Sequence, residues 1–446
     1  MSRVVADLSL LKSPKEPVSS RSNKKYSRPL TLEETGLSEI LLTELVSKHL
    51  LEAGVLDMAG LCVRMALSGP VLETLIQFMR QEALVEIKPS YGGQRSLRYN
   101  LTDKGRQFAH DCLSKSGYQG PAPIPLEVYQ ELVKEQSIHN VTVTDDMMAE
   151  GLAGVTLTDG LRDQLGPAMN SGRAIFVYGH AGTGKTYITK KMAPIFGDAI
   201  FIPFAIAIGE AIIQIFDPVL HKAINTDHLQ PQLRLEEGSD ARLILCQRPV
   251  LITGGELSID MLNVTFDHDL RQYRAPLQLK VNNGIYIIDD MGRQRSTPKE
   301  IFNRWIVPLE EQKDYLTLGS GRHFEVPFDE VVIFSSNINP LELADEAYLR
   351  RIGYKIHFVP MSRSEYCRVW EQECSINKVE FDRTVLDFVI DSLHLPNEKP
   401  LLPCMPRDLL SIAIDYSKYK KIEHAITKES IRWAWNNYFV QLNESN

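Results

Sequence analysis

The sequence has no paired cysteines and no long apolar run. Six cysteines are spread over 446 residues without any CxxC spacing, at positions 62, 112, 246, 367, 374 and 404. This spacing excludes the common zinc-ligand patterns and predicts reduced, structural cysteines. The richest apolar stretch, 201–216, is interrupted by proline, glycine and polar residues, so we expect no membrane span. The apolar stretch 8–11 is too short for a secretory signal, and we therefore expect a cytoplasmic protein.

A strong positive charge is also missing. The formal net charge is -8, which gives no overall electrostatic footprint for nucleic acid. Residues 1–30 differ, because seven basic residues against two acidic residues leave an excess of five positive charges (7 − 2 = 5). This segment is also rich in Ser and Pro, so we predict a disordered basic arm, with docking to an acidic partner as the alternative.

The region 31–116 predicts a small helical domain with a two-stranded ribbon. Apolar periodicity indicates helices over 37–51, 57–66, 70–82 and 103–113. Strands are predicted over 84–88 and 97–101, on either side of a turn at 91–94. This order of elements resembles a winged helix-turn-helix domain. The segment that ends the domain's ribbon is also similar to that family: Tyr99-Asn100-Leu101-Thr102-Asp103-Lys104-Gly105.

A winged helix implies either DNA binding or protein docking. The third helix carries Arg80 but also Glu73 and Glu82, which is a poor match for phosphates, whereas Lys88, Arg95 and Arg98 lie near the wing. We therefore expect protein docking in preference to DNA binding, and a purely structural role stays open.

A Gly/Pro-rich linker is predicted at 117–126, followed by an α/β domain at 127–360. Short apolar runs at 174–178, 199–202, 285–288, 331–334 and 355–359 alternate with helical patterns. Such runs are typical of strands buried on both faces, and they predict a parallel sheet. Helices predicted at 363–374, 383–393, 407–419 and 428–441 then form a C-terminal helical lid, 361–446.

A phosphate-binding loop follows the first of these runs. The loop consists of Gly179, His180, Ala181, Gly182, Thr183, Gly184, Lys185 and Thr186. It fits GxxxxGK[ST] at every fixed position of that motif. Glycines let several backbone N–H groups point at one anion, and the helix N-terminus adds partial positive charge. We expect Lys185 to reach the β and γ phosphates of ATP and the Thr186 hydroxyl to ligate Mg²⁺. His180 stands at a variable position.

Two acidic residues end the run 285–288. Asp289 is predicted to hold Mg²⁺, and Asp290 to orient or deprotonate the attacking water. The pattern is a Walker B motif with Asp in place of the more frequent second Glu, as in the DnaA and helicase-loader groups that it resembles.

From about 140 to 420 the chain resembles AAA+ ATPases. Asn337, after the run 331–334, is similar to sensor 1, and Arg407 is similar to sensor 2 of the lid. In the segment 344–352, Arg351 is the first candidate for an arginine finger and Arg350 the second. The resemblance implies ATP and Mg²⁺ as ligands, a finger that acts on a neighbouring subunit, and hence a homo-oligomeric ring. The segment 151–155 resembles the lining of the adenine pocket, or is a simple loop.

Two additions resemble the MoxR-like and chelatase-like branches. A long insertion at 204–283 contains a predicted hairpin at 208–210, and a second hairpin is predicted at 314–326. The resemblance implies that such hairpins face the ring pore and touch a substrate; the alternative is that they only pad the fold.

Three functions follow from these patterns. The first is an oligomeric AAA+ ATPase that remodels or assembles a protein partner. The alternative is a DNA-directed ATPase, a loader or regulator, that binds DNA through the winged helix. A slow nucleotide switch is the third. A GAFTGA loop is missing from the sequence, which argues against the sigma-54 activator branch.

Overall fold

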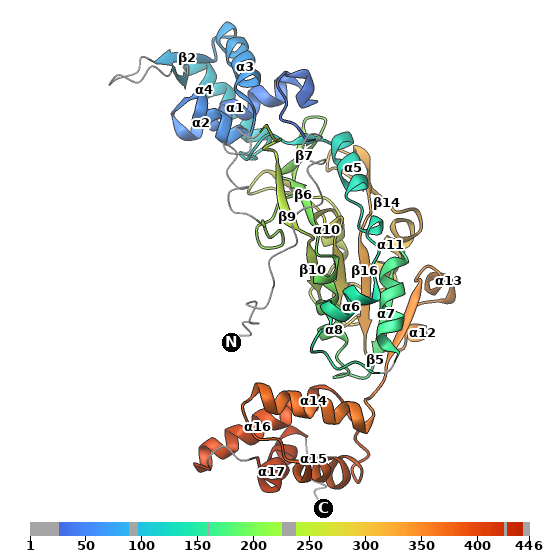
Figure 1. Ribbon diagram of the computed structural model, residues 1–446. Helices are drawn as coiled ribbons and strands as arrows, with labels where there is room; N and C mark the ends of the chain where they lie inside the picture. Colours follow the sequence, from blue (N-terminus) through green and yellow to red (C-terminus); the bar gives the residue numbers. More distant parts are fainter. Residues whose placement is uncertain (1–25, 89–96, 159, 225–237, 423–425, 440–446) are drawn as a thin grey trace, which may run out of the picture.

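The computed structural model describes residues 26–88, 97–158, 160–224, 238–422 and 426–439 (Figure 1). A helical N-terminal domain lies at one end, an α/β part in the middle, and a helical lid at the other end. The predicted arm up to residue 25, the turn 91–94 and Arg95 fall outside the described residues.

The N-terminal domain contains the predicted helices and strands, with one strand added. Its elements are η1 (Glu33–Thr35), α1 (Glu39–Ala53), β1 (Val55–Asp57), α2 (Met58–Met65), α3 (Gly69–Gln81), β2 (Val85–Lys88), β3 (Arg98–Leu101) and α4 (Asp103–Lys115). The strands pair antiparallel in the order β1-β3-β2. Periodicity missed β1 because three residues carry too little pattern.

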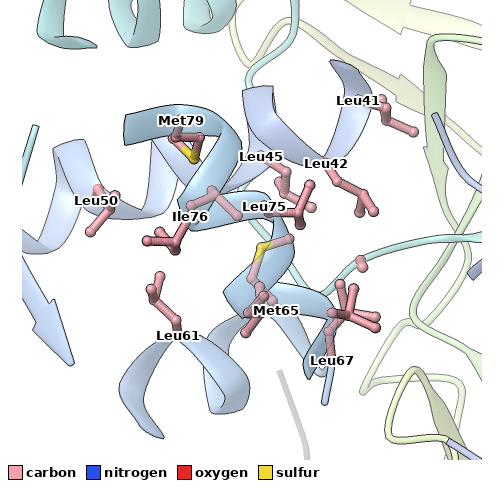
Figure 2. Close-up of a cluster of buried hydrophobic side chains, with 14 of the residues drawn as sticks. Leu41, Leu42, Leu45, Leu50, Leu61, Met65, Leu67, Leu75, Ile76 and Met79 are labelled. Carbon is pink, nitrogen blue, oxygen red and sulfur yellow. The ribbon is translucent and has the colours of Figure 1, made fainter. Parts of the chain in front are cut away.

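One apolar cluster holds this domain together (Figure 2). Leu42 and Leu45 of α1 meet Leu61 of α2 and Leu75 and Met79 of α3, and all five side chains are fully buried. The α3 residues recur at helical spacing, so the helix presents one apolar face to the others. Ser38 and Thr102 cap α1 and α4 by accepting hydrogen bonds from Leu41 and Gly105 N–H groups.

The segment predicted as a linker, 117–126, is packed against its neighbours. It contains β4 (Ile124–Pro125), which pairs parallel with β7 (Ala205–Ile208), and Tyr118 and Ile124 are buried. The Ala122 N–H donates to the Met65 carbonyl oxygen at 2.8 Å, which fixes the segment to the N-terminal domain.

Arg242 ties the N-terminal domain to the α/β part. Its guanidinium is 4% exposed and forms an ion pair of 2.8 Å with Asp240. It also donates to the Thr35 carbonyl at 3.0 Å and to the Pro123 carbonyl at 3.3 Å. One buried cation thus joins η1, the segment 117–126 and the insertion.

We expect Arg242→Ala to destabilise the protein by about 3–5 kcal/mol, because Asp240 would stay buried without its partner. The measurement is the shift of the urea unfolding midpoint. Arg274→Ala is the matched control, since its guanidinium is 66% exposed and pairs with Asp267 at the surface; we expect it to cost at most about 1 kcal/mol. Equal shifts of the unfolding midpoint for the two variants would contradict the proposed role of Arg242 in joining the two parts.

The central sheet is parallel and has the order β10-β13-β16-β5-β17. Its strands are β10 (Val250–Thr253), β13 (Ile285–Ile288), β16 (Val331–Ser336), β5 (Ile175–Gly179) and β17 (Tyr354–Phe358). Alternate residues enter two apolar clusters, with Val177 and Ile287 in one and Phe176 and Tyr286 in the other. Both faces are therefore covered, as the continuous apolar runs predict.

One predicted strand is in the wrong place. The run 199–202 forms β6 (Ala199–Pro203), which pairs antiparallel with β9 (Leu243–Gln247) outside the central sheet. Its predicted place in the sheet is taken by β10, an edge strand that is paired on one side only in the described order and leaves Ile252 partly exposed. Apolar periodicity identifies a strand but not the sheet to which it belongs.

Helices and short turns pack against the central sheet and the other strands of the α/β part. They are α5 (Leu126–Glu135), η2 (Ile138–Asn140), α6 (Asp145–Gly151), α7 (Leu161–Asn170), α8 (Lys185–Met192), η3 (Ala193–Phe196), η5 (Ile259–Leu262), α10 (Leu277–Val281), α11 (Pro298–Glu311), α12 (Pro340–Leu343) and α13 (Glu346–Leu349). In α11, Trp305 is fully buried and packs edge-on against Tyr286 of β13.

Both predicted hairpins are present. The first joins β7 to β8 (Ala211–Gln214) in a second, mixed sheet with β11 (Thr265–Asp267), β12 (Gln272–Arg274) and β4. The second joins β14 (Lys313–Thr317) to β15 (His323–Pro327), directly after α11. Gly209 and Arg322 of the two turns lie so close that a Cβ on Gly209 would be 2.1 Å from an Arg322 guanidinium nitrogen.

The lid is helical, as predicted. It contains α14 (Arg363–Ile376), α15 (Arg383–Phe388), the π-helical η6 (Val389–His394), α16 (Cys404–Lys420) and α17 (Lys428–Tyr438). Its core gathers Trp370, Leu386, Leu409 and Ile431. Capping boxes at Ser362 and Thr427 begin α14 and α17.

No single helix of the described residues is long and apolar enough to cross a membrane. The pair α2 and α3 passes on length and composition together, but it is bent by 109° and supplies the core of the N-terminal domain. The six cysteines all lie in the described residues; Cys62, Cys112, Cys367, Cys374 and Cys404 are free thiols, and Cys246 is buried.

Candidate nucleotide-binding site

The phosphate loop connects β5 to α8 in the conformation that the motif requires. Gly179, Gly182 and Gly184 have φ values of 142°, 85° and 86°, a region that disfavours other residues. A Cβ on Gly179 would be 2.2 Å from the Phe358 carbonyl oxygen, so backbone closeness as well as φ demands glycine there. His180 and Ala181 are exposed in the loop, and Thr183 is buried, with its hydroxyl donating to the His180 carbonyl at 2.8 Å.

Lys185 lies at the centre of the site. Its Nζ donates to the carbonyl oxygens of Gly179 at 2.8 Å and His180 at 2.9 Å, and to Asn337 Oδ1 at 2.8 Å. Burial lowers the pKa of the ammonium, while the nearby Asp289 and Asp290 act in the opposite direction. The cation is thus held over the loop by oxygen acceptors.

Thr186 and Asp289 stand side by side. The Thr186 hydroxyl donates to Asp289 Oδ2 at 2.7 Å across the gap between α8 and the end of β13. A hydroxyl and a carboxylate are hard oxygen donors that suit Mg²⁺, an ion that takes only one or two protein carboxylates beside substrate phosphates. The described residues hold no group of three or more His, Cys, Asp and Glu that could bind a metal by themselves. The donor set therefore fits a nucleotide-bound Mg²⁺.

Asp290 has an unusual backbone for its residue type. Its φ is 50°, in the left-handed region where non-glycine residues are uncommon and Asn and Asp are enriched. Gln294 Nε2 donates to the carbonyl oxygens of Asp289 at 2.9 Å and Asp290 at 3.2 Å, which supports the turn. Gln294 belongs to none of the motifs described above, so its role in this turn was not predicted.

Asn337 bridges the cation and the second carboxylate. Its Oδ1 accepts from Lys185, and its Nδ2 donates to Asp290 Oδ1 at 3.3 Å. Since an amide has one acceptor end and one donor end, these two partners fix its orientation. The end of β16 thus joins the ends of β5 and β13 at one edge of the sheet.

The two candidate finger residues lie away from these contacts. Arg351 is 29% exposed, pairs with Glu310 at 3.1 Å and donates to the Ala347 carbonyl at 2.8 Å. Arg350 is 81% exposed, with Glu346 at 3.9 Å. Within the described residues, neither guanidinium pairs with the phosphate loop of its own chain.

Lid residues approach the phosphate loop from outside. A Cβ on Gly182 would be 2.5 Å from Cys404 Sγ and 3.5 Å from Leu402 Cδ1, so α16 begins against the loop. Arg407, one turn further on, pairs with Asp408 at 2.9 Å, and this hydrogen bond raises the pKa of its guanidinium. The contact of Cys404 with the loop was not predicted, because no local pattern reports it.

The segment 151–155 lies between the body and the lid. Leu152 is buried in the cluster that includes Val177, and Val155 packs against it. One residue further, the Thr156 hydroxyl donates to Gln372 of α14 at 3.1 Å. Thr156, directly after the segment, therefore contacts the lid, and the adenine pocket at 151–155 stays a prediction.

These features define a P-loop nucleotide-binding fold. A further strand, β16, separates the phosphate-loop strand β5 from the carboxylate strand β13, and a helical lid follows the sheet. This is the AAA+ form of the P-loop fold, as predicted.

Comparisons with known proteins add no function. A family model described as a domain of unknown function, DUF8689, matches residues 362–437, which is the lid. A search of curated proteins finds no match. Similar solved structures include NtrX from Brucella abortus, with 12% identity over 66% of this chain and 57% of that chain and a TM-score of 0.42. The Holliday junction branch migration motor RuvB from Thermotoga maritima has 13% identity over 68% of each chain and a TM-score of 0.34.

Proposed function

We propose that this chain binds ATP with Mg²⁺ and hydrolyses it. The observation that carries the proposal is the bridge from Lys185 through Asn337 to Asp290, beside the Thr186–Asp289 pair. A cation for phosphates, two oxygen donors for a metal and a carboxylate for water would thus share one edge of the sheet, which supports the proposal. Bound Mg²⁺ would neutralise charge on the phosphates.

Each residue then has a role. Lys185 binds the β and γ phosphates, and Thr186 and Asp289 hold the metal. Asp290 orients or deprotonates the attacking water, and Asn337 positions that water between carboxylate and γ-phosphate. Arg407 breaks its ion pair with Asp408 and reaches the γ-phosphate from the lid. This change of partner would couple the lid angle to nucleotide state.

We further propose a cytoplasmic homo-oligomer that remodels or assembles a protein partner, in the manner of the MoxR-like branch. The β7–β8 and β14–β15 hairpins support this role, since their turns lie together at Gly209 and Arg322. Ser38, at the start of α1, donates to Glu210 of the same turn at 3.4 Å, so the N-terminal domain also borders it. Protein docking by that domain is the role we favour.

A DNA-directed ATPase is the second candidate, and the winged-helix order of the N-terminal domain motivates it. Against it, Lys88 lies 3.9 Å from Glu86 and Lys104 lies 3.8 Å from Glu82, so acidic residues compete with phosphates for these lysines. DNA that stimulates ATP turnover more than any protein partner would favour this candidate.

The first test is steady-state ATP hydrolysis by the parent protein and by Lys185→Ala. We expect the variant to lose about 10²–10³-fold in kcat, the usual effect of removing one preorganised charge-stabilising donor. Lys190→Ala, an exposed lysine on the same helix, is the control and should keep full activity. Equal activity in all three proteins would refute the assignment of the site.

A further inference from the structure

The lid carries a surface of aromatic and basic side chains outside its core. Tyr416 of α16 and Trp433 of α17 stack with ring centroids 4.6 Å apart and an interplanar angle of 28°. Tyr419 is 80% exposed and Trp433 is 41% exposed. Tyr416, Tyr419 and Lys420 stand at i, i+3 and i+4, so they share one side of α16. The lid core does not need these exposed rings, because Trp370, Leu409 and Ile431 fill it.

Basic residues accompany the rings. Lys420 Nζ lies 6.0 Å from the Tyr416 ring centroid and 5.7 Å from that of Tyr419. Lys418 and Lys421 are exposed beside it, and within the described part of the lid none of the three lysines forms an ion pair. The segment 415–433 has five basic and three acidic residues, a net charge of +2 (5 − 3) in a chain of net charge -8.

Two properties of this surface select its ligand. Lysines without ion-pair partners attract phosphates, and exposed ring faces offer stacking to unpaired bases. A duplex keeps its bases stacked inside and could use only the lysines. An acidic peptide would likewise pair with the lysines, but it has no regularly spaced planar groups that could stack on Tyr419 and Trp433.

We propose that the lid surface formed by Tyr416, Lys418, Tyr419, Lys420, Lys421 and Trp433 binds single-stranded nucleic acid. Bases stack on Tyr419 and on the exposed face of Trp433, while the lysines pair with the flanking phosphates. This site goes beyond the proposed ATPase and does not depend on it. It lies on the lid, at the opposite end of the molecule from the N-terminal domain (Figure 1). A protein substrate at the hairpins could therefore be bound at the same time.

The test is fluorescence anisotropy of labelled oligothymidylate and oligouridylate titrated with the full chain. The oligomers are about 20 nucleotides long, more than the roughly 4–16 that one single-strand module covers. We expect Tyr419→Ala to weaken binding roughly 5- to 150-fold, the usual range for one lost base–aromatic stack. Trp433→Ala should act similarly, whereas Trp433→Phe should retain most binding. Replacing Lys418, Lys420 and Lys421 together with Gln should flatten the slope of log K against log[salt] by about 2.

Tyr315→Ala is the matched control, because Tyr315 is an exposed tyrosine near Lys313 but lies on β14. It should bind oligonucleotides like the parent protein. Absence of binding by a parent protein that turns over ATP normally would overturn the proposal and assign the surface to a protein partner. Equal competition by duplex DNA, or unchanged binding by Tyr419→Ala, would also overturn it. Loss of ATP turnover by Lys185→Ala with oligonucleotide binding intact would show that the two proposals stand separately.

Discussion

Asp290→Asn is expected to reduce kcat for ATP hydrolysis by about 10²–10⁴-fold, the range that general-base catalysis supplies. ATP binding should be nearly unchanged, because Lys185, Thr186 and Asp289 keep their places. The substitution is nearly isosteric, and Asn tolerates the left-handed φ of 50° as well as Asp does. The Asn337 amide at 3.3 Å can still donate to the new side-chain oxygen. The loss would therefore report the missing carboxylate charge and not a distorted turn.

Single-turnover hydrolysis and equilibrium binding of a fluorescent ATP analogue measure the two quantities separately. Asp290→Glu is the informative companion, because it restores a carboxylate whose reach is one methylene longer. We expect it to recover part of the lost rate. Asp269→Asn, an exposed aspartate in the insertion, serves as the control. A loss of ATP binding that parallels the loss of rate would mean that Asp290 holds the metal instead of the water.

The phosphate loop was predictable because its geometry is local. Glycine spacing, the preceding apolar strand and the following helix all lie within 174–192, and two of the three loop glycines with positive φ, Gly179 and Gly184, are fixed positions of the motif. The role of Asn337 was expected only through the resemblance to AAA+ proteins, and its hydrogen bond with Asp290 was not predicted. The two residues are brought together by the register of β13 with β16, and no spacing pattern in the sequence predicts that register.

Contacts between distant segments were not predictable. The apolar run 199–202 indicates a strand, but its partner β9 lies inside the long insertion 204–283, so its sheet could not be assigned. The contact of Cys404 with Gly182 depends on the packing of α16 against the phosphate loop, and nothing near Cys404 in the sequence predicts it. Likewise, the Gly and Pro residues of 117–126 indicate a linker, whereas the pairing of β4 with β7 packs that segment into the second sheet.

The structure sharpens the choice between the two finger candidates. Arg351 is held by Glu310 and the Ala347 carbonyl, which fixes its guanidinium at the surface end of α13. Arg350 is more exposed, and its only ion pair within the described residues is long, at 3.9 Å. A finger gains from being held in position, since less side-chain entropy is lost on reaching the phosphate. We therefore keep Arg351 as the first candidate and Arg350 as the second.

Arg351→Ala is expected to reduce kcat by about 10³–10⁵-fold, the contribution of an arginine finger supplied by a neighbouring subunit. Arg350→Ala should have a much smaller effect. Glu310→Gln is the structural control. It removes the carboxylate charge that pairs with Arg351 but keeps the arginine itself. For the parent protein, specific activity should rise with protein concentration if, as we propose, each site is complete only in an oligomer.

Mixing two inactive variants decides whether Arg351 acts between subunits. Arg351→Ala subunits keep an intact phosphate loop, and Lys185→Ala subunits keep an intact finger. Where the two kinds are neighbours, the loop of one meets the finger of the other, so partial activity should return on mixing. If Arg351 acts within its own chain, no mixture can contain a complete site, and activity stays at the level of the separate variants. Restoration would support the subunit interface and the nucleotide site together, because neither variant can hydrolyse ATP without the residue that the other provides.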